Sequence, residues 1–178
     1  MYERQVLYSL QEVPSPKNWY AVRTRTHQEK FVEQWLQNKC HESFLPLRKI
    51  IKKWSDRKKI VQEPLFRGYL FVRCLPHETW NVSQHSAVLY LLGTEKQNQL
   101  PIPAADILAL QRFVESSIAI DPYPYLRAGQ RIRVRNGIFK GIEGFIVKKK
   151  RECRLVFTVE MMQQSVSVEV DEASVEAI

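Results

Sequence analysis

The residue types that could support catalysis or metal binding are few and scattered. There are three cysteines, Cys40, Cys74 and Cys153, with no C-x-x-C pair, so neither a disulfide framework nor a zinc site is expected. The four histidines lie in different segments, and the chain has no nucleophile elbow, phosphate-binding glycine loop or H-E-x-x-H motif. We therefore expect a non-enzymatic protein without metal or cofactor, with reduced thiols in the cytoplasm.

No membrane association is expected either. The first residues lack the apolar stretch of a signal peptide. No run approaches the roughly 20 apolar residues that a helix needs to cross a bilayer.

Basic residues are the second chemically informative group. The chain carries 27 Lys and Arg against 19 Asp and Glu, a formal net charge of +8, which favours a polyanionic partner. One cluster surrounds the single acid Asp56 and consists of Arg48, Lys49, Lys52, Lys53, Arg57, Lys58 and Lys59. A solvated surface is the plain interpretation, but these charges repel one another unless an anion approaches. A second cluster consists of Arg23, Arg25 and Lys30.

A set of apolar residues allows two interpretations. Its members are large side chains of the kind that usually fill a core: Phe66, Tyr69, Phe71, Leu92, Ile107 and Leu110. Such residues also line exposed grooves that accept a partner helix, where aromatic side chains act as anchors. We expect Phe66 at an interface and Phe71 in the core.

The elements that would position these residues begin with a unit of mixed structure at 18–119. Short β-prone runs alternate there with helical periodicity, which predicts an α+β unit with helices on a mostly antiparallel sheet. Residues 49–61 are predicted to form a β-hairpin with a basic tip at 55–58. Residues 1–17 end in a proline cluster and are expected to be an N-terminal extension.

Two helices of this unit have predicted boundaries. Thr26 is expected as the N-cap of the first helix, with Glu29 at capping-box spacing. The last helix is predicted over 104–118, where apolar residues recur at helical spacing.

The pattern changes after the proline-rich segment 120–127, which we expect to be a linker. Residues 128–178 contain short β-prone runs, a strong turn signal at Asn136-Gly137 and a glycine inside a strand at Gly144, which together predict a small β-barrel. The period-two run Val166, Val168 and Val170 favours a strand over a helix. We therefore expect a β-barrel as the resting state of this region, and an open apolar groove.

Two segments resemble a known family. Trp19-Tyr20-Ala21-Val22, followed later by Pro64-Leu65-Phe66-Arg67-Gly68-Tyr69-Leu70-Phe71-Val72, resembles the signature of the NusG N-terminal (NGN) domain. Gly137-Ile138-Phe139-Lys140-Gly141-Ile142-Glu143-Gly144 resembles a KOW motif. Arg67 departs from the proline that most relatives carry. The long basic hairpin and the chain length resemble the specialised RfaH and UpxY antiterminators more than housekeeping NusG.

The resemblance implies an NGN sandwich, a KOW barrel, and transcription elongation or antitermination as the activity. The apolar set would bind the clamp helices of bacterial RNA polymerase, and Asn81 and Ser83 would reach its gate loop. The cation clusters would contact upstream or non-template DNA, and backbone contacts of this kind give affinity without sequence choice.

Further partners are implied for the KOW barrel. A ribosomal protein or the termination factor Rho would bind it, and the protein would be a monomer. An RNA-binding protein of ribosome assembly is the alternative, because KOW barrels also occur there. That alternative leaves the Trp19–Val72 signature unexplained.

Overall fold

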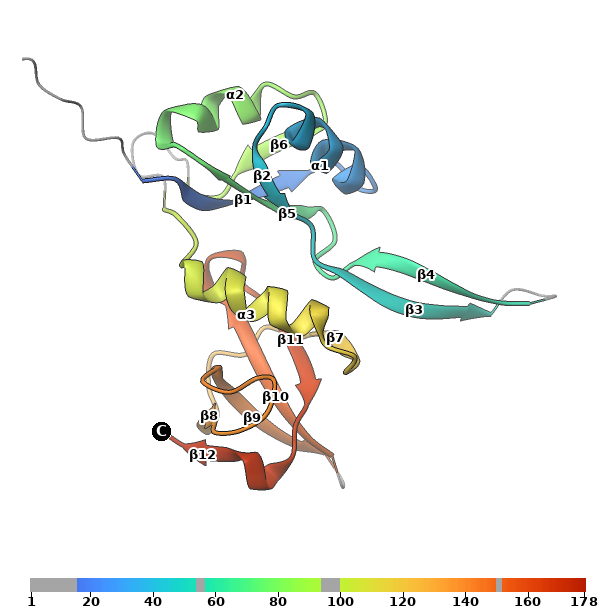
Figure 1. Ribbon diagram of the computed structural model, residues 1–178, viewed down its shortest axis with the longest axis vertical. Helices are drawn as coiled ribbons and strands as arrows, with labels where there is room; N and C mark the ends of the chain where they lie inside the picture. Colours follow the sequence, from blue (N-terminus) through green and yellow to red (C-terminus); the bar gives the residue numbers. More distant parts are fainter. Residues whose placement is uncertain (1–15, 54–56, 94–99, 150–151) are drawn as a thin grey trace, which may run out of the picture.

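The computed structural model describes residues 16–53, 57–93, 100–149 and 152–178. Most of the expected N-terminal extension and half of the expected hairpin tip lie outside the described residues. The chain forms an N-terminal unit of sheet and helices and a C-terminal all-β unit, with helix α3 (Ala104–Glu115) between them (Figure 1). The predicted α+β fold class is confirmed.

The N-terminal unit is built on a four-stranded antiparallel sheet in the order β2-β5-β1-β6. Its strands are β1 (Asn18–Thr24), β2 (Glu42–Phe44), β5 (Tyr69–Cys74) and β6 (Val88–Leu91). Both faces of the central strand β1 are covered, since Trp19 to Val22 are all buried. This explains why β1 and β5 read as continuous apolar runs without polar alternation.

Different helices cover the two faces of this sheet. Helices α1 (Glu29–Asn38) and α2 (Thr79–Ser83), the latter preceded by the 3₁₀ turn η1 (Pro76–Glu78), pack on one face, and α3 lies on the opposite side (Figure 1). Tyr20 and Val22 therefore share a core with α1 and α2, whereas Trp19 and Ala21 share a core with α3. The alternation along β1 sends successive side chains to opposite faces.

The predicted capping box at the start of α1 is wrong. Gln28 is the N-cap residue, and no side chain caps the helix. The Glu29 side chain is instead buried, and its Oε1 accepts a hydrogen bond from the backbone N–H of Gly68 at 2.6 Å. A backbone N–H from the turn before β5 therefore replaces the local partner, and it satisfies a carboxylate that would be costly to bury unpaired.

The predicted hairpin is confirmed as a separate two-stranded sheet. Strands β3 (Leu47–Lys53) and β4 (Lys58–Pro64) pair from Leu47 opposite Pro64 to Lys53 opposite Lys58. The pair extends away from the rest of the molecule (Figure 1).

The C-terminal unit is a six-stranded antiparallel sheet in the order β12-β8-β9-β10-β11-β7. Its strands are β7 (Ile120–Tyr123), β8 (Arg131–Val134), β9 (Glu143–Lys149), β10 (Glu152–Val159), β11 (Gln164–Glu169) and β12 (Val175–Ala177), with the 3₁₀ turns η2 (Glu160–Met162) and η3 (Glu172–Ser174). The region around the period-two valines is thus strand rather than helix, as predicted.

Two boundaries differ from the sequence-based expectations. Residues 120–123, expected in the linker, form β7 and pair with β11. Pro122 is tolerated because β7 is an edge strand, where one side of the backbone needs no partner. Helix α3 ends at Glu115, not at residue 118, and Ser116 is already extended.

Replacing Gly144 with alanine is expected to destabilise the C-terminal unit by about 2 kcal/mol, because overpacking of this kind costs roughly 1–3 kcal/mol. A Cβ at Gly144 would lie 2.4 Å from the carbonyl oxygen of Val156 on the adjacent strand. Urea unfolding would measure the destabilisation. Gly137→Asn is the control, since a Cβ there meets nothing within 4 Å and asparagine tolerates the positive φ of 81°. Equal stability of Gly144→Ala and the parent protein would contradict the predicted clash between this Cβ and the Val156 carbonyl oxygen.

Candidate functional site

The apolar set predicted from the sequence lies where the N-terminal sheet meets α3. Phe66, Phe71, Ile107 and Leu110 have exposed fractions of 0–1 %, and Tyr69 has 8 %. Leu92 is half-buried and packs against the same cluster. The structure therefore brings the whole set together, but as a closed cluster.

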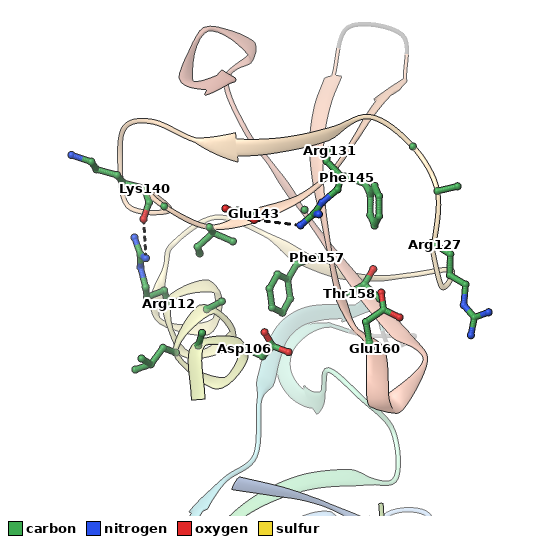
Figure 2. A pocket seen from close by; sticks show the side chains of 18 residues that line it. Asp106, Arg112, Arg127, Arg131, Lys140, Glu143, Phe145, Phe157, Thr158 and Glu160 are labelled. Atoms are coloured by element: carbon green, nitrogen blue, oxygen red, sulfur yellow. Dashed lines mark hydrogen bonds and ion pairs between the residues drawn. The ribbon is translucent and has the colours of Figure 1, made fainter. Parts of the chain in front are cut away.

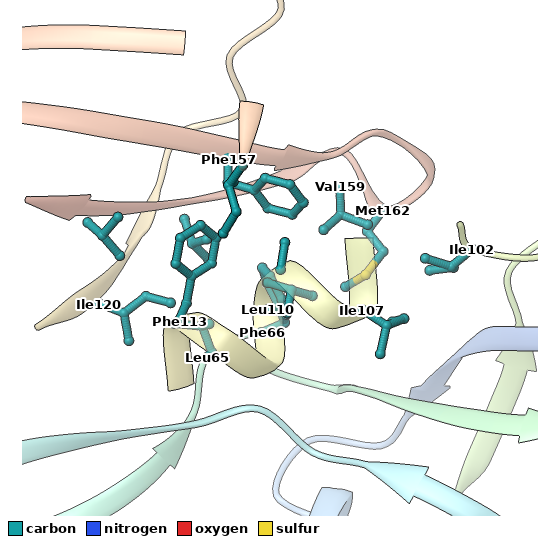
Figure 3. Close-up of a cluster of buried hydrophobic side chains, with 14 of the residues drawn as sticks. Leu65, Phe66, Ile102, Ile107, Leu110, Phe113, Ile120, Phe157, Val159 and Met162 are labelled. Atoms are coloured by element: carbon teal, nitrogen blue, oxygen red, sulfur yellow. The ribbon is translucent and has the colours of Figure 1, made fainter. Parts of the chain in front are cut away.

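Helix α3 separates the sheet from the C-terminal unit and contacts both. Figure 3 shows Leu65 and Phe66 on one side of α3 and Phe157, Val159 and Met162 on the other. One continuous hydrophobic cluster thus extends from the N-terminal strands into the C-terminal sheet.

Two adjacent residues of α3 form the best-defined contacts between the units. The Phe113 ring packs edge-on against Phe139 at 5.0 Å and Phe157 at 5.5 Å between centroids. Arg112 donates hydrogen bonds to the carbonyl oxygens of Ile138 and Lys140 in the C-terminal unit. Apolar burial and a charged donor therefore hold the units together.

The expectation of an open groove is wrong for this structure. Ile107 and Leu110 face the apolar interior instead of solvent, because α3 is sandwiched between two apolar surfaces. Burial of these large side chains is worth roughly 1.5–3 kcal/mol each, so the closed arrangement is the favoured one once the two surfaces meet. Any partner for the apolar set must displace part of this packing.

A cleft of about 1110 Å³ opens beside the contact between α3 and the C-terminal unit. Ala105, Asp106 and Ala109 of α3 line one side, and Phe157 and Glu160 lie on the opposite side (Figure 2). Burial, reinforced by the negative charge of Glu160, raises the pKa of Asp106 to about 6. Protonation of Asp106 therefore favours the folded protein.

Replacing Asp106 with asparagine is expected to stabilise the protein by about 1 kcal/mol at pH 7.5, a value discounted for the partial solvent access of this group. The folded pKa of about 6 lies above the unfolded value of about 3.9. The contribution of Asp106 to stability is thus present below about pH 4 and is lost as the pH rises through about 6. Asparagine removes that pH-dependent destabilisation.

Thermal unfolding at pH 7.5 and at pH 3.5 tests this prediction. The gain should be seen at pH 7.5 and disappear at pH 3.5. The control is Glu115→Gln, an exposed carboxyl group at the end of the same helix. A gain of equal size at both pH values would contradict the titration of Asp106.

Arg23, expected at a nucleic-acid site, is held by structural contacts. Its guanidinium lies 4.5 Å from the centroid of the Tyr69 ring and donates a hydrogen bond to the carbonyl oxygen of Arg67 at 3.0 Å. A Cβ on Gly68 would lie 2.7 Å from this guanidinium, so Gly68 leaves the space that Arg23 occupies. Arg25 and Lys30 are exposed nearby.

The basic residues of the hairpin divide into paired and unpaired groups. Arg48 forms an ion pair with Asp121 of β7 at 3.0 Å, and Lys52 with Glu63 at 2.5 Å. Lys49, Lys53, Lys58 and Lys59 are exposed, and none of them forms an ion pair with another residue in the part of the chain that the structure describes. Arg57 is exposed as well.

Asn81 and Ser83 lie apart from the apolar set. Both belong to α2, on the opposite side of the sheet from α3 (Figure 1). Asn81 is exposed, whereas the Ser83 hydroxyl donates to the carbonyl oxygen of Trp80 at 2.6 Å. Trp80 is 67 % exposed on the same helix, and the sequence analysis did not single it out. In the sequence, only its position next to Asn81 and Ser83 could have indicated that Trp80 belongs to the same surface.

The positions of the cysteines and acidic residues decide whether a disulfide, a reactive thiolate or a metal-binding group can form. The three cysteines are free, and burial raises the pKa of Cys74 to about 12. Among the described residues there is no group of three or more His, Cys, Asp or Glu side chains that could hold a metal ion. Within the same residues, no helix is long and apolar enough to cross a membrane.

Residues 17–111 match the family model described as NusG, transcription termination factor. The transcription termination/antitermination protein NusG of Borreliella burgdorferi is 26 % identical, over 90 % of this chain and 98 % of that protein. The protein of the same description from Vibrio cholerae is 25 % identical, over 95 % of this chain and 100 % of that protein.

A chain from a crystal structure of an MjSpt4:Spt5 complex in conformation B aligns at a TM-score of 0.32 with 15 % identity. The alignment covers 90 % of this chain and 96 % of that chain.

Proposed function

Because the chain belongs to the NusG family of transcription termination/antitermination factors, we propose that it binds the clamp helices of bacterial RNA polymerase through the apolar set between its N-terminal sheet and α3. One observation carries this proposal. The family match at 17–111 covers the strands and most of the helix whose side chains form one continuous apolar cluster. Partner helices bind to apolar grooves, and this cluster would present such a groove once its packing opens.

Binding requires a change of arrangement in this protein. Phe66, on the sheet side of α3, and Ile107 are buried in the closed molecule, so the packing of α3 against both the sheet and the C-terminal unit must loosen before the clamp helices can dock. The free energy of closure then lowers the apparent affinity, because only the open fraction binds. Asn81 and Ser83 on α2 would reach the gate loop from the other side of the sheet.

Bridging the polymerase cleft would favour elongation. A ligand shifts an equilibrium between two states only by the difference in its affinity for them, so the protein must bind the closed, elongating state more tightly than the paused state. A difference of about 1–2 kcal/mol shortens pauses roughly 5- to 30-fold. Suppressed pausing or termination is the expected outcome.

The basic hairpin and the exposed Arg25 and Lys30 would contact upstream or non-template DNA. Such contacts add affinity through phosphate neutralisation. The released C-terminal unit would recruit a ribosomal protein or Rho at raised local concentration, as a tethered module does. We further propose that this cytoplasmic, monomeric factor acts at specific operons, as RfaH- and UpxY-type proteins do.

Single-round transcription with the cognate core polymerase tests the central proposal. On a template with mapped pause sites, the protein is expected to shorten pause half-lives several-fold. Copurification with polymerase subunits should accompany this effect. Copurification with ribosomal precursors and unchanged pausing would instead favour the role in ribosome assembly.

A further inference from the structure

The β3–β4 hairpin has two chemically different faces. In an antiparallel pair, directly opposite residues point to the same side, and successive residues alternate. The inner face consists of Arg48, Ile50 and Lys52 with their partners Glu63, Val61 and Lys59. The outer face consists of Lys49, Ile51 and Lys53 with their partners Gln62, Ile60 and Lys58.

The inner face is the one joined to the body of the protein. Arg48 pairs with Asp121 of β7 and so ties this face to the body, whereas the Lys52–Glu63 pair lies within the hairpin. Ile50 and Val61 are half-buried between these pairs. The Arg48–Asp121 contact turns the inner face toward the body and leaves the outer face in solvent.

The outer face combines exposed apolar surface with unpaired positive charge. Ile51 and Ile60 lie directly opposite each other, and their exposed fractions are 69 % and 68 %. Lys49 lies two residues before Ile51 on β3, and Lys53 with its partner Lys58 lies two residues beyond. None of these lysines forms an ion pair within the described residues.

Such a surface fits an anionic partner that also offers apolar groups at its centre. An exposed apolar pair on a free two-stranded ribbon promotes aggregation unless a partner covers it. Duplex DNA has the complementary pattern, because its major groove admits a two-stranded β-ribbon between two rows of phosphates. The floor of that groove carries the C5-methyl groups of thymine, to which apolar side chains bind.

We propose that the outer face of the hairpin enters the major groove of duplex DNA, with the Ile51–Ile60 pair against thymine methyl groups and Lys49, Lys53 and Lys58 at the flanking phosphates. The inference rests on the proposed DNA contact of the hairpin and adds base readout to it. Duplex RNA fits poorly, since its major groove is too deep and narrow for side chains to read and uracil lacks the methyl group.

The test compares two duplexes that differ only in thymine methyl groups. The full-length protein is titrated, by fluorescence anisotropy, against a thymine-rich duplex and against the same duplex with deoxyuridine in place of thymidine. The phosphates and the other base-edge groups are identical. Removal of one buried methyl group is expected to weaken binding about fourfold. Equal affinity for the two duplexes would overturn the proposal, and so would tighter binding to duplex RNA of the same sequence.

Variants assign the effect to the isoleucine pair. Ile51→Ser/Ile60→Ser should bind both duplexes equally, and Ile51→Val/Ile60→Val, which keeps the β-branched shape, should retain a preference for thymine. Ile138→Ser is the matched control, because Ile138 is 55 % exposed near the basic Lys140 in the C-terminal unit. A thymine preference that survives in the serine variant would overturn the assignment.

The assay separates this inference from the proposed function. Pause shortening and polymerase copurification depend on the apolar set at α3 and do not require a thymine preference. A protein that shortens pauses but binds both duplexes equally therefore disproves only the base readout. Far-UV circular dichroism of the serine variant establishes that it retains the parent strand content.

Discussion

Replacing both Arg112 and Phe113 with alanine is expected to raise the affinity of the protein for core RNA polymerase by roughly an order of magnitude. Phe113 is fully buried, and its ring contacts Phe139 and Phe157 across the boundary between the units. Truncating a buried phenylalanine costs about 3–5 kcal/mol, and the charged hydrogen bonds of Arg112 are removed as well. Both substitutions remove contacts that form only when the two units are docked, so they destabilise the closed arrangement relative to the open one.

The proposed polymerase site is left intact by this change. Phe66, Ile107 and Leu110 keep their identity, and alanine has the highest helix propensity, so α3 should persist in the open protein. If only the open fraction binds, opening raises the apparent affinity until the open form dominates. Substituting Phe66 itself would not separate binding from folding, because Phe66 is 1 % exposed.

Biolayer interferometry with immobilised core polymerase measures the affinity, and NMR relaxation reports whether the two units tumble separately. Two controls bracket the result. Arg135→Ala removes a cation whose hydrogen bond, to the carbonyl oxygen of Ala173, stays within the C-terminal unit. Leu36→Ala creates a cavity on the far side of the N-terminal sheet. Units that separate without any gain in polymerase affinity would show that the apolar set is not the polymerase site.

Reversing the charge of Lys49, Lys53, Lys58 and Lys59 to glutamate is expected to remove most of the DNA affinity of the hairpin. Removing one lysine–phosphate interaction should lower the dependence of log K on log salt by about 0.9, so removing the three of the outer face (Lys49, Lys53 and Lys58) would lower the slope by about 2.7, while Lys59 on the inner face adds little. These four lysines are exposed and unpaired within the described residues, so their replacement breaks no observed ion pair.

Affinity for duplex DNA at several salt concentrations provides the slope. The control is charge reversal at Lys17, Lys39 and Lys140, three exposed lysines outside the hairpin. This variant changes the net charge nearly as much but should preserve most of the slope. An unchanged slope in the hairpin variant would mean that its charges face only solvent.

Features set by neighbours along the chain were predictable from the sequence. The hairpin follows from two apolar-basic runs around a polar turn, and its observed register runs from Leu47 opposite Pro64 to Lys53 opposite Lys58. The strand at 164–169 follows from valines at every second position, which can all be buried only in a period-two structure. The α+β class follows from the same local periodicities.

Features set by distant partners were not predictable in this way. Glu29 has the spacing of a capping residue, yet its carboxylate accepts a hydrogen bond from the backbone N–H of Gly68, 39 residues away. Residues 120–123 have a linker composition but become an edge strand because β11 offers a free side. In both cases the local preference is worth about 1 kcal/mol, and a buried hydrogen bond or a strand pairing outweighs it.

Whether the apolar set is exposed or covered also depends on both local sequence and distant partners. The sequence by itself determined that large apolar side chains would gather around Phe66 and α3, because their periodicity assigns them to one surface. Whether that surface is open or closed depends on the C-terminal unit, whose Phe157, Val159 and Met162 come from more than forty residues further along the chain. Only the tertiary structure decided this, because the free energy of docking two preformed apolar surfaces is a property of their shapes in space and leaves no periodic signal in either segment.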